Sequence, residues 1–262
     1  MKLWFVLGTD AARRFVEPIL TELVASGHEV QVSIESGTTH PFESAPHVGV
    51  DRLAVEPAAD KRGLRGARLL RTFASYVLLR ERWPPLLRRR WIEYFPPLLA
   101  RGVRSIDAAR VSFILDNPLT RRSLMAAARA VPTPAALERQ LEDHAPDVVV
   151  VTPMIYPGTR ELDIVRAARR RGVPTVGLVL SWDNLTSKAT FHDVPDRLVV
   201  WNESQRREAA ELHGVPSERV EALGAPVFDH LFDRTRLARR ADVLASLGLE
   251  PDARYVLYAV SS

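Results

Sequence analysis

Polar side chains that could handle a hydroxyl-bearing substrate follow two apolar runs of the chain. Val176–Leu180 leads into Ser181-Trp182-Asp183-Asn184 and then Lys188, and Leu198–Trp201 leads into Asn202-Glu203. Carboxylates can take a proton from a hydroxyl group, and a lysine can neutralise a phosphate or carboxylate on a ligand. Short, Val-rich apolar runs bounded by turn formers predict strands buried on both faces of a parallel sheet. Ligands of such sheets bind beyond the carboxyl ends of the strands, so we expect the site there.

Two further strand ends contribute candidates. Lys2–Leu7 is followed by Thr9 and Asp10, and Asp147–Thr152 ends in Thr152. Asp10 and Asp183 are the carboxylates placed to deprotonate an acceptor hydroxyl, and they are our predicted catalytic residues. Structural alternatives stay open, because Asp10 could cap the first helix and Asp183-Asn184 could form an Asx turn.

The remaining candidates are predicted to bind the acceptor, and each has a structural alternative. Arg13 could bind an acidic group or lie on an exposed helix face, and Lys188 could bind an anion or be a solvated loop residue. Asn202 and Glu203 fit a helix cap better than a catalytic role, since Asn202 and Gln205 have capping-box spacing. Trp182 is more consistent with a core or cleft-wall position than with a sugar-stacking platform. The predicted acceptor-binding set is Thr9, Arg13, Thr152, Ser181, Trp182, Asn184, Lys188, Asn202 and Glu203.

Alternating strand and helix patterns must position these residues. The run Lys2–Leu7, an amphipathic helix through Phe15–Val24 and the strand His28–Ile34 form a βαβ unit, which demands a parallel sheet. Further strands are predicted at 50–55, 147–152, 176–180, 198–201 and 219–223, with helices at 160–171, 202–213 and 229–247. We therefore expect an α/β fold with a doubly wound parallel sheet.

A basic and aromatic segment interrupts this pattern. Twelve basic and two acidic residues lie between Lys61 and Arg104, with aromatic residues among them. Helices are expected here, broken at Pro84-Pro85 and Pro96-Pro97, and short helices separated by prolines should continue to residue 144. The segment could bind an anionic membrane surface, or it could be a solvated helix face; nucleic acid binding is not expected.

Composition excludes several classes of function. The chain has no cysteine, so disulfides and thiol chemistry are ruled out, and no His/Asp cluster has the spacing of metal ligands. The turn Gly8–Ala12 lacks the G-x-G-x-x-G fingerprint, so no nicotinamide cofactor is expected. The apolar run Leu3–Leu7 is too short for a signal peptide, and no run reaches the roughly 20 residues that cross a bilayer. We expect a cytoplasmic protein, with peripheral attachment to the inner face of the membrane as an open alternative.

Several segments together resemble the N-terminal half of GT-B glycosyltransferases and their relatives, the UDP-N-acetylglucosamine 2-epimerases and CDP-glycerol glycerophosphotransferases. The most specific are S-W-D-N-L-T-S-K at Ser181–Lys188 and the later W-N-E at Trp201–Glu203. Less specific segments are Gly8–Phe15, Ser26–Val30, Ala145–Pro153, Arg170–Thr175, Pro195–Ala209, His213–Val220 and Leu223–Asp229. The likeness covers nearly the whole chain except the basic insert, roughly residues 56–130.

The resemblance implies a Rossmann-like acceptor-side domain over residues 1–248, which would bind a glycan or lipid-linked acceptor. Residues 249–262 would be a linker and the first strand, Tyr255–Val260, of a donor-binding domain that is otherwise missing. The nucleotide-sugar would then be a co-substrate held mostly by that missing domain, leaving this chain inactive alone. The implied reaction is sugar transfer, with epimerisation, glycerophosphate transfer or non-catalytic glycan or lipid binding as alternatives.

Overall fold

The computed structural model describes residues 1–54, 61–108, 112–156, 160–232 and 238–258. The chain forms two compact units, Met1–Pro226 and Val227–Ser262. The first domain was predicted to reach residue 248, whereas the first compact unit ends at Pro226. Among the described residues, no helix combines the length and the apolar character that crossing a membrane requires.

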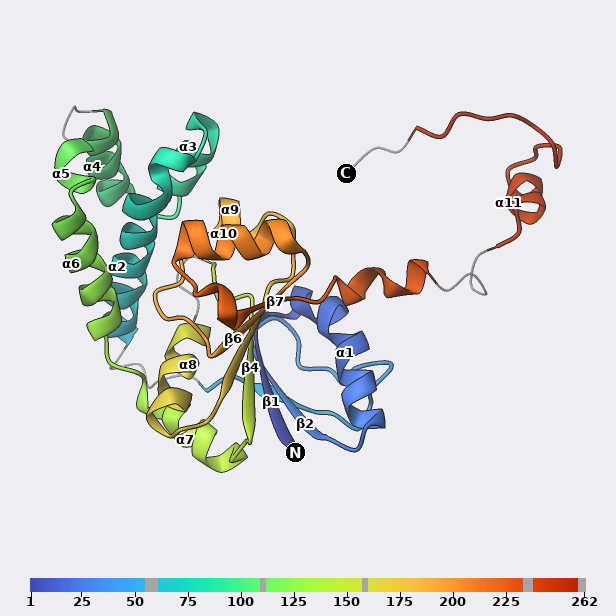
Figure 1. Ribbon diagram of the computed structural model, residues 1–262, viewed down its shortest axis with the longest axis horizontal. Coiled ribbons are helices and arrows are strands. Elements are labelled where there is room, and N and C mark those ends of the chain that lie inside the picture. Colours follow the sequence, from blue (N-terminus) through green and yellow to red (C-terminus); the bar gives the residue numbers. More distant parts are fainter. Residues whose placement is uncertain (55–60, 109–111, 157–159, 233–237, 259–262) are drawn as a thin grey trace. The chain divides into compact units, whose positions relative to one another are not determined.

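Within the described residues, the first unit contains one sheet of seven parallel strands in the order β3-β2-β1-β4-β5-β6-β7 (Figure 1). The strands are β1 (Lys2–Thr9), β2 (Glu29–Ser36), β3 (Gly49–Arg52), β4 (Val148–Thr152), β5 (Thr175–Leu178), β6 (Arg197–Val200) and β7 (Val220–Ala222). In the centre of the sheet, Phe5 of β1 is in register with Val32 of β2 and Val150 of β4. The predicted fold class, α/β with a doubly wound parallel sheet, is confirmed.

Helices cover both faces of this sheet because its strands are apolar on both sides. On one face, α1 (Arg13–Ala25) packs through Val16 and Leu20. On the other face, α7 (Ala135–His144) and α8 (Glu161–Arg170) bury their apolar sides. The other described helical elements around the sheet are, in chain order, the 3-10 turn η1 (Asp10–Ala12), the helices α9 (Asn184–Ser187) and α10 (Glu203–His213), and the 3-10 turn η4 (Ser217–Arg219).

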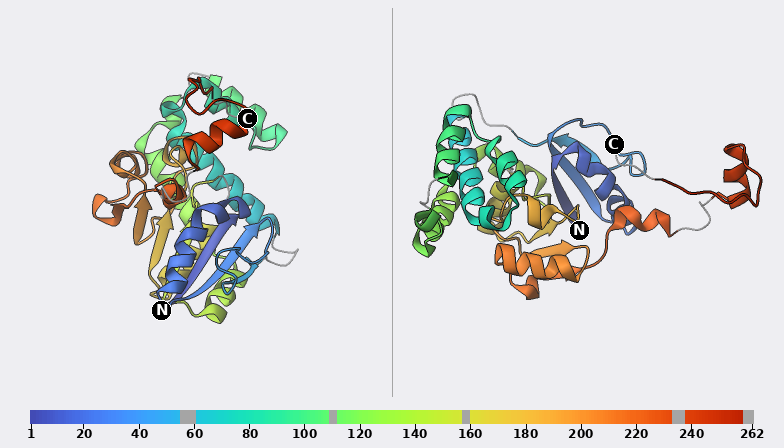
Figure 2. Two further views of the ribbon diagram at one scale, coloured as in Figure 1. Left: turned by 90° about the vertical axis from the view of Figure 1, so that its right-hand side faces the viewer. Right: turned by 90° about the horizontal axis from the view of Figure 1, so that it is seen from above.

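The basic segment forms a helical insert on the α8 side of the unit, opposite α1 (Figures 1 and 2). It contains α2 (Lys61–Leu79), η3 (Arg80–Arg82), α3 (Pro85–Ile92), α4 (Pro97–Ala108), α5 (Ser112–Leu115) and α6 (Pro118–Ala130). The predicted breaks are confirmed, because α3 begins at Pro85 and α4 at Pro97. Proline is tolerated at the first position of a helix, where a backbone N–H has no partner within the helix. Tyr76, Trp83, Trp91 and Phe95 form its buried aromatic core.

Two expectations for the C-terminal part were wrong. The single helix predicted at 229–247 is instead η5 (Pro226–Leu231) and α11 (Arg240–Ser246), and Arg239 between them has extended backbone. The strand predicted at Tyr255–Val260 is absent from Tyr255–Tyr258, and residues 259–260 lie outside the described residues. A strand requires a hydrogen-bonded neighbour, and none pairs with this segment among the residues described. Within the second unit, Arg240 lies 5.1 Å from the ring centre of Tyr255.

Candidate functional site

The predicted site residues gather at one edge of the sheet. Thr9 ends β1, Thr152 ends β4, Ser181 follows β5 and Asn202 follows β6, and all of these strands are parallel. The prediction that they share the carboxyl edge is therefore confirmed. Successive strands run outward from β1 to β3 on one side and from β4 to β7 on the other. The chain thus changes direction between β1 and β4, the position where open α/β sheets bind ligands.

The loop Ser181–Lys188 is organised around the Asp183 carboxylate. The carboxylate accepts hydrogen bonds from the hydroxyl groups of Ser181, at 2.7 Å, and Ser187, at 2.8 Å. The Lys188 ammonium lies 3.5 Å from the carboxylate and 5.3 Å from the ring centre of Tyr156. One side chain thus ties both ends of the loop together and places a cation beside itself.

Asn184 and Leu185 anchor the loop to the interior of the unit. Both are buried, and the Asn184 amide oxygen accepts a hydrogen bond from the backbone N–H of Leu180 at 3.2 Å. Asn184 therefore fixes the backbone just after β5 instead of facing solvent. Because these two residues occupy the buried side of the turn, Trp182 points outward and is 74% exposed. The expectation of a core position for Trp182 was wrong, whereas the alternative of a cleft-wall position stays a prediction.

Both predicted catalytic carboxylates ionise readily. Burial opposes ionisation of Asp183, but the hydrogen bonds from Ser181 and Ser187 and the Lys188 charge outweigh it, so the pKa of Asp183 is lowered. A hydrogen bond from the backbone N–H of Thr38 is the main cause of the lowered pKa of Asp10. A carboxylate with a lowered pKa is a weak base. Both side chains are therefore better suited to accepting hydrogen bonds than to removing a proton.

Asp10 and Arg13 face a different loop from Asp183. Asp10 accepts hydrogen bonds from the N–H and hydroxyl of Thr38, and Arg13 donates to the Pro41 carbonyl at 2.7 Å. Gly37 permits this contact, because its φ is +109° and an added Cβ would lie 2.2 Å from the Asp10 carboxyl carbon. Since β4 lies between β1 and β5, strand spacing separates the two groups by about 10 Å. The structure thus places them along one edge without bringing them into contact.

Three candidates have structural partners. The Thr152 side chain is buried, and its hydroxyl donates to the Leu178 carbonyl at 2.9 Å. Asn202 caps α10 by accepting from the Gln205 N–H at 3.0 Å, while exposed Glu203 pairs with Arg206. The Gln205 side-chain oxygen accepts a hydrogen bond from the backbone N–H of Trp201, and not from that of Asn202 as a capping box would require. Thr9 is exposed and makes no side-chain cap.

The helical insert holds the same loop, which sequence reasoning missed. The indole N–H groups of Trp83 and Trp91 donate to the carbonyls of Thr186, at 2.8 Å, and Ser187, at 3.0 Å. The two rings are stacked with their centres 4.6 Å apart. From the other side, His213 at the end of α10 contacts the Leu185 carbonyl at 2.7 Å. The aromatic residues of the insert were the only sequence signal, and they do not reveal their partners.

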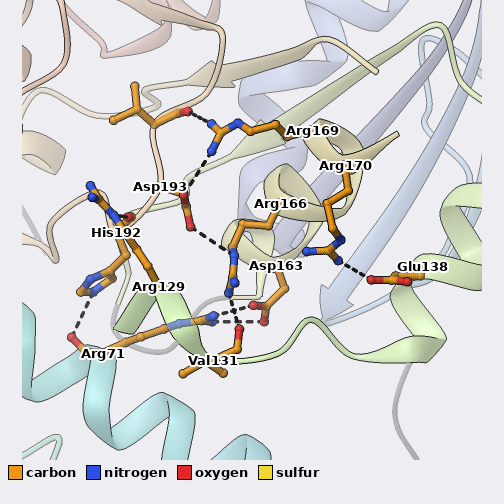
Figure 3. A network of polar contacts seen from close by, with 11 residues as sticks. Arg71, Arg129, Val131, Glu138, Asp163, Arg166, Arg169, Arg170, His192 and Asp193 are labelled. Atoms are coloured by element: carbon orange, nitrogen blue, oxygen red, sulfur yellow. Dashed lines mark hydrogen bonds and ion pairs between the residues drawn. The ribbon is translucent and has the colours of Figure 1, made fainter. Parts of the chain in front are cut away.

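Buried charges join the insert to the sheet, and these too were missed. Arg71 of α2 forms two hydrogen bonds with Asp163 of α8, at 3.1 and 2.5 Å, and both residues are about 95% buried or more (Figure 3). Burial raises the pKa of nearby Glu35 against the opposing charge of Arg160. Glu161, also buried, packs against Gly8 so closely that a Cβ there would lie 2.2 Å from its carboxylate oxygen. This group of acids lies close to the position where the chain changes direction.

His192 and Ser75 lie together but do not form a nucleophile and base. His192 Nε2 lies 3.1 Å from the Ser75 hydroxyl and 3.1 Å from the Arg71 carbonyl. A carbonyl can only accept, so Nε2 carries the proton and cannot take one from Ser75. Burial, together with the Arg71 charge, lowers the pKa of His192 to about 3, which keeps the ring neutral. Within the described part of the chain, no group of three His, Asp or Glu residues could hold a metal ion.

The arrangement therefore offers an exposed indole, an ionised carboxylate and a cation on one hydrogen-bonded loop at the carboxyl edge of a parallel sheet. Comparison with protein-family models yields no match, and comparison with curated proteins yields none.

Proposed function

We propose that this chain is the acceptor-binding part of a GT-B-like glycosyltransferase, which transfers a sugar from a nucleotide donor to a glycan or lipid-linked acceptor. The observation that carries the proposal is the loop Ser181–Lys188, where exposed Trp182 adjoins the ionised carboxylate of Asp183. The same loop contains the most specific part of the resemblance to this superfamily. Its position at the carboxyl edge is where ligands of parallel sheets bind.

These side chains match the chemistry of a sugar. A pyranose ring presents C–H groups on its faces and hydroxyl groups around its edge. The broad apolar indole of Trp182 can cover a face, while Asp183 and Ser181 bind hydroxyl groups at the edge. Lys188 adds a positive charge 3.5 Å from Asp183, which would bind a phosphate or carboxylate on the acceptor.

In this proposal Asp183 orients the acceptor. Its pKa is lowered, and a general base near neutral pH works best with a pKa close to that pH. The lowered pKa values of Asp183 and Asp10 also favour a second candidate function, a non-catalytic glycan- or lipid-binding domain. The two candidates share the binding site and differ in whether transfer follows.

Calorimetric titration of the 262-residue chain would test the shared claim. The ligands would be methyl glycosides, short glycans, glycerol phosphate and short-chain polyprenyl phosphates, with UDP and CDP as nucleotide comparisons. We expect at least one acceptor to bind in the micromolar to millimolar range, and Trp182→Ala or Asp183→Asn to weaken it about tenfold or more. The control is Asp147→Asn, which changes a carboxylate beside the first residue of β4, at the opposite edge.

Equal affinity in Trp182→Ala, Asp183→Asn and the wild type would refute the proposed site. Nucleotide binding that depends on Asp183 would instead assign this edge to the donor. If acceptors bind as expected, the chain would be incubated with nucleotide-sugars and a separate donor-binding domain. Formation of a glycosylated acceptor would distinguish sugar transfer from binding alone.

A further inference from the structure

Helices α3 and α4 expose leucines that their core does not require. Leu86 of α3 and Leu98 of α4 are 79% and 80% exposed, and Leu99 is 49% exposed. The opposite sides of the two helices already fill the core of the insert, through residues such as Trp91 and Val103. Each of these leucines presents a large apolar side chain to water, a feature of surfaces that bind a partner.

Three exposed arginines lie on the same two helices. Arg89, Arg90 and Arg101 are exposed, and no ion pair joins any of them to a carboxylate in the described part of the chain. Glu93 is the only acidic residue between Pro84 and Arg104. By contrast, Arg170 and Arg171 pair with Glu138 and Glu142. Within the described residues, the positive charge of Arg89, Arg90 and Arg101 is therefore not neutralised by an ion pair.

The leucines and arginines lie on common helix faces. Leu86, Arg89 and Arg90 are three and four residues apart, the spacing that places side chains on one side of a helix. Leu98 and Arg101 have the same relation on α4. The two helices pack together and lie at the end of the insert where α2 finishes (Figure 1).

We infer that this α3–α4 surface docks on an anionic phospholipid membrane. Leucine side chains would enter the boundary between headgroups and acyl chains, and arginines would bind lipid phosphates. A nucleic acid fits less well, because it offers exposed leucines no partner, and the stacked indoles of Trp83 and Trp91 are buried in the insert. The docking does not depend on the proposed transfer reaction.

The surface is directly connected to the candidate site. Trp91 belongs to α3, and its N–H donates to the Ser187 carbonyl of the loop Ser181–Lys188. A membrane-bound α3 would therefore hold the acceptor loop near the lipid surface. This last step rests on the proposed function, since it assumes that the loop binds the acceptor.

Vesicle flotation with the 262-residue chain tests the docking without any enzymatic activity. The vesicles are phosphatidylcholine alone and phosphatidylcholine with phosphatidylglycerol, at low and at raised salt. We expect binding only to vesicles with phosphatidylglycerol, weakened by salt because exposed charges are screened. Arg89→Gln with Arg90→Gln should lower the partition constant roughly 30-fold, about fivefold for each arginine. Leu86→Ser with Leu98→Ser should lower it at least as much.

Matched controls remove the same groups elsewhere. Arg170→Gln with Arg171→Gln removes equal charge from α8 and the residue after it, and Leu247→Ser removes a leucine that is 64% exposed in the second unit. Each should bind vesicles within about twofold of the wild type. Thermal unfolding checks that all variants are folded. We expect them to fold, because the substituted side chains are exposed.

Four outcomes would overturn the inference. These are no binding to either vesicle, equal binding to both, an equal loss in the Arg170/Arg171 control, or leucine variants that bind like the wild type. If the leucine variants bind normally while heparin or RNA competes for the arginines, the surface binds a polyanion and not a membrane.

Discussion

Acidification should destabilise the fold through two histidines that flank the candidate loop. His192 is buried beside Arg71 and Arg129, and His213 contacts the Leu185 carbonyl. Burial lowers their pKa values from 6.5 to about 3 and about 4 respectively. A lowered histidine pKa means that the unfolded chain takes up protons first. Their contribution to stability is therefore complete above pH 6.5 and declines as the pH falls toward the folded-state values.

The size of the loss follows from these values. At about pH 5 both histidines are mostly protonated in the unfolded chain and mostly neutral in the folded one. The unfolded-state pKa of 6.5 lies roughly 1.5 units above pH 5. This difference corresponds to a loss of about 2 kcal/mol of unfolding free energy for each histidine. Together they would remove about 4 kcal/mol, a large part of the 5–15 kcal/mol that is typical of a folded protein.

Urea unfolding at about pH 7.5 and about pH 5 measures this loss in the wild type and in His192→Gln and His213→Gln. The lowered pKa values of Asp10 and Asp183 act only below about pH 4, and the raised values of Glu35 and Glu208 act in the opposite direction. Comparing variants removes these contributions. Each substitution should reduce the pH-dependent loss by about 2 kcal/mol. A His192→Gln protein with the wild-type pH dependence would show that burial of His192 does not cause the acid-induced loss of stability.

Three further predictions concern single contacts. Trp91→Phe keeps the stacked ring but removes the bond to the Ser187 carbonyl, so it should cost about 1 kcal/mol and speed hydrogen exchange at residues 185–188. Arg71→Met should cost about 3–5 kcal/mol in urea unfolding because Asp163 stays buried without its partner. If the double variant Arg71→Met with Asp163→Leu is no more stable than Arg71→Met alone, the unpaired buried carboxylate is not the cause of the loss. Asn202→Ala should lower the unfolding free energy by about 1 kcal/mol through the lost cap of α10, and a change below about 0.3 kcal/mol would contradict the cap.

Local patterns were sufficient to predict the sheet. Valine-rich runs such as Asp147–Thr152 predict buried strands, and the order of strands and helices makes the sheet parallel, so the shared edge of Thr9 and Ser181 follows. Pro85 and Pro97 likewise mark helix starts that the structure confirms. These features depend on residues that are close in sequence.

The contacts that shape the site depend on residues far apart in sequence. Trp83 and Trp91 reach the loop from about a hundred positions away, and Arg71 reaches Asp163 from 92 positions away. No periodicity encodes such partners. The exposure of Trp182 was also hidden, because it results from Asn184 and Leu185 taking the buried side of the turn. The apolar pattern of Tyr255–Val260 favoured a strand, but pattern alone supplies no neighbour to pair with.

The most direct test of the central claim is to map where an acceptor binds. Hydrogen exchange of the 262-residue chain, with and without the tightest-binding acceptor, would locate the protected backbone. We expect new protection centred on residues 181–188, lost in Asp183→Asn, with the amino edge of the sheet around Asp147 unchanged. Protection confined to another surface, or protection at 181–188 that persists in Asp183→Asn and Trp182→Ala, would contradict this expectation.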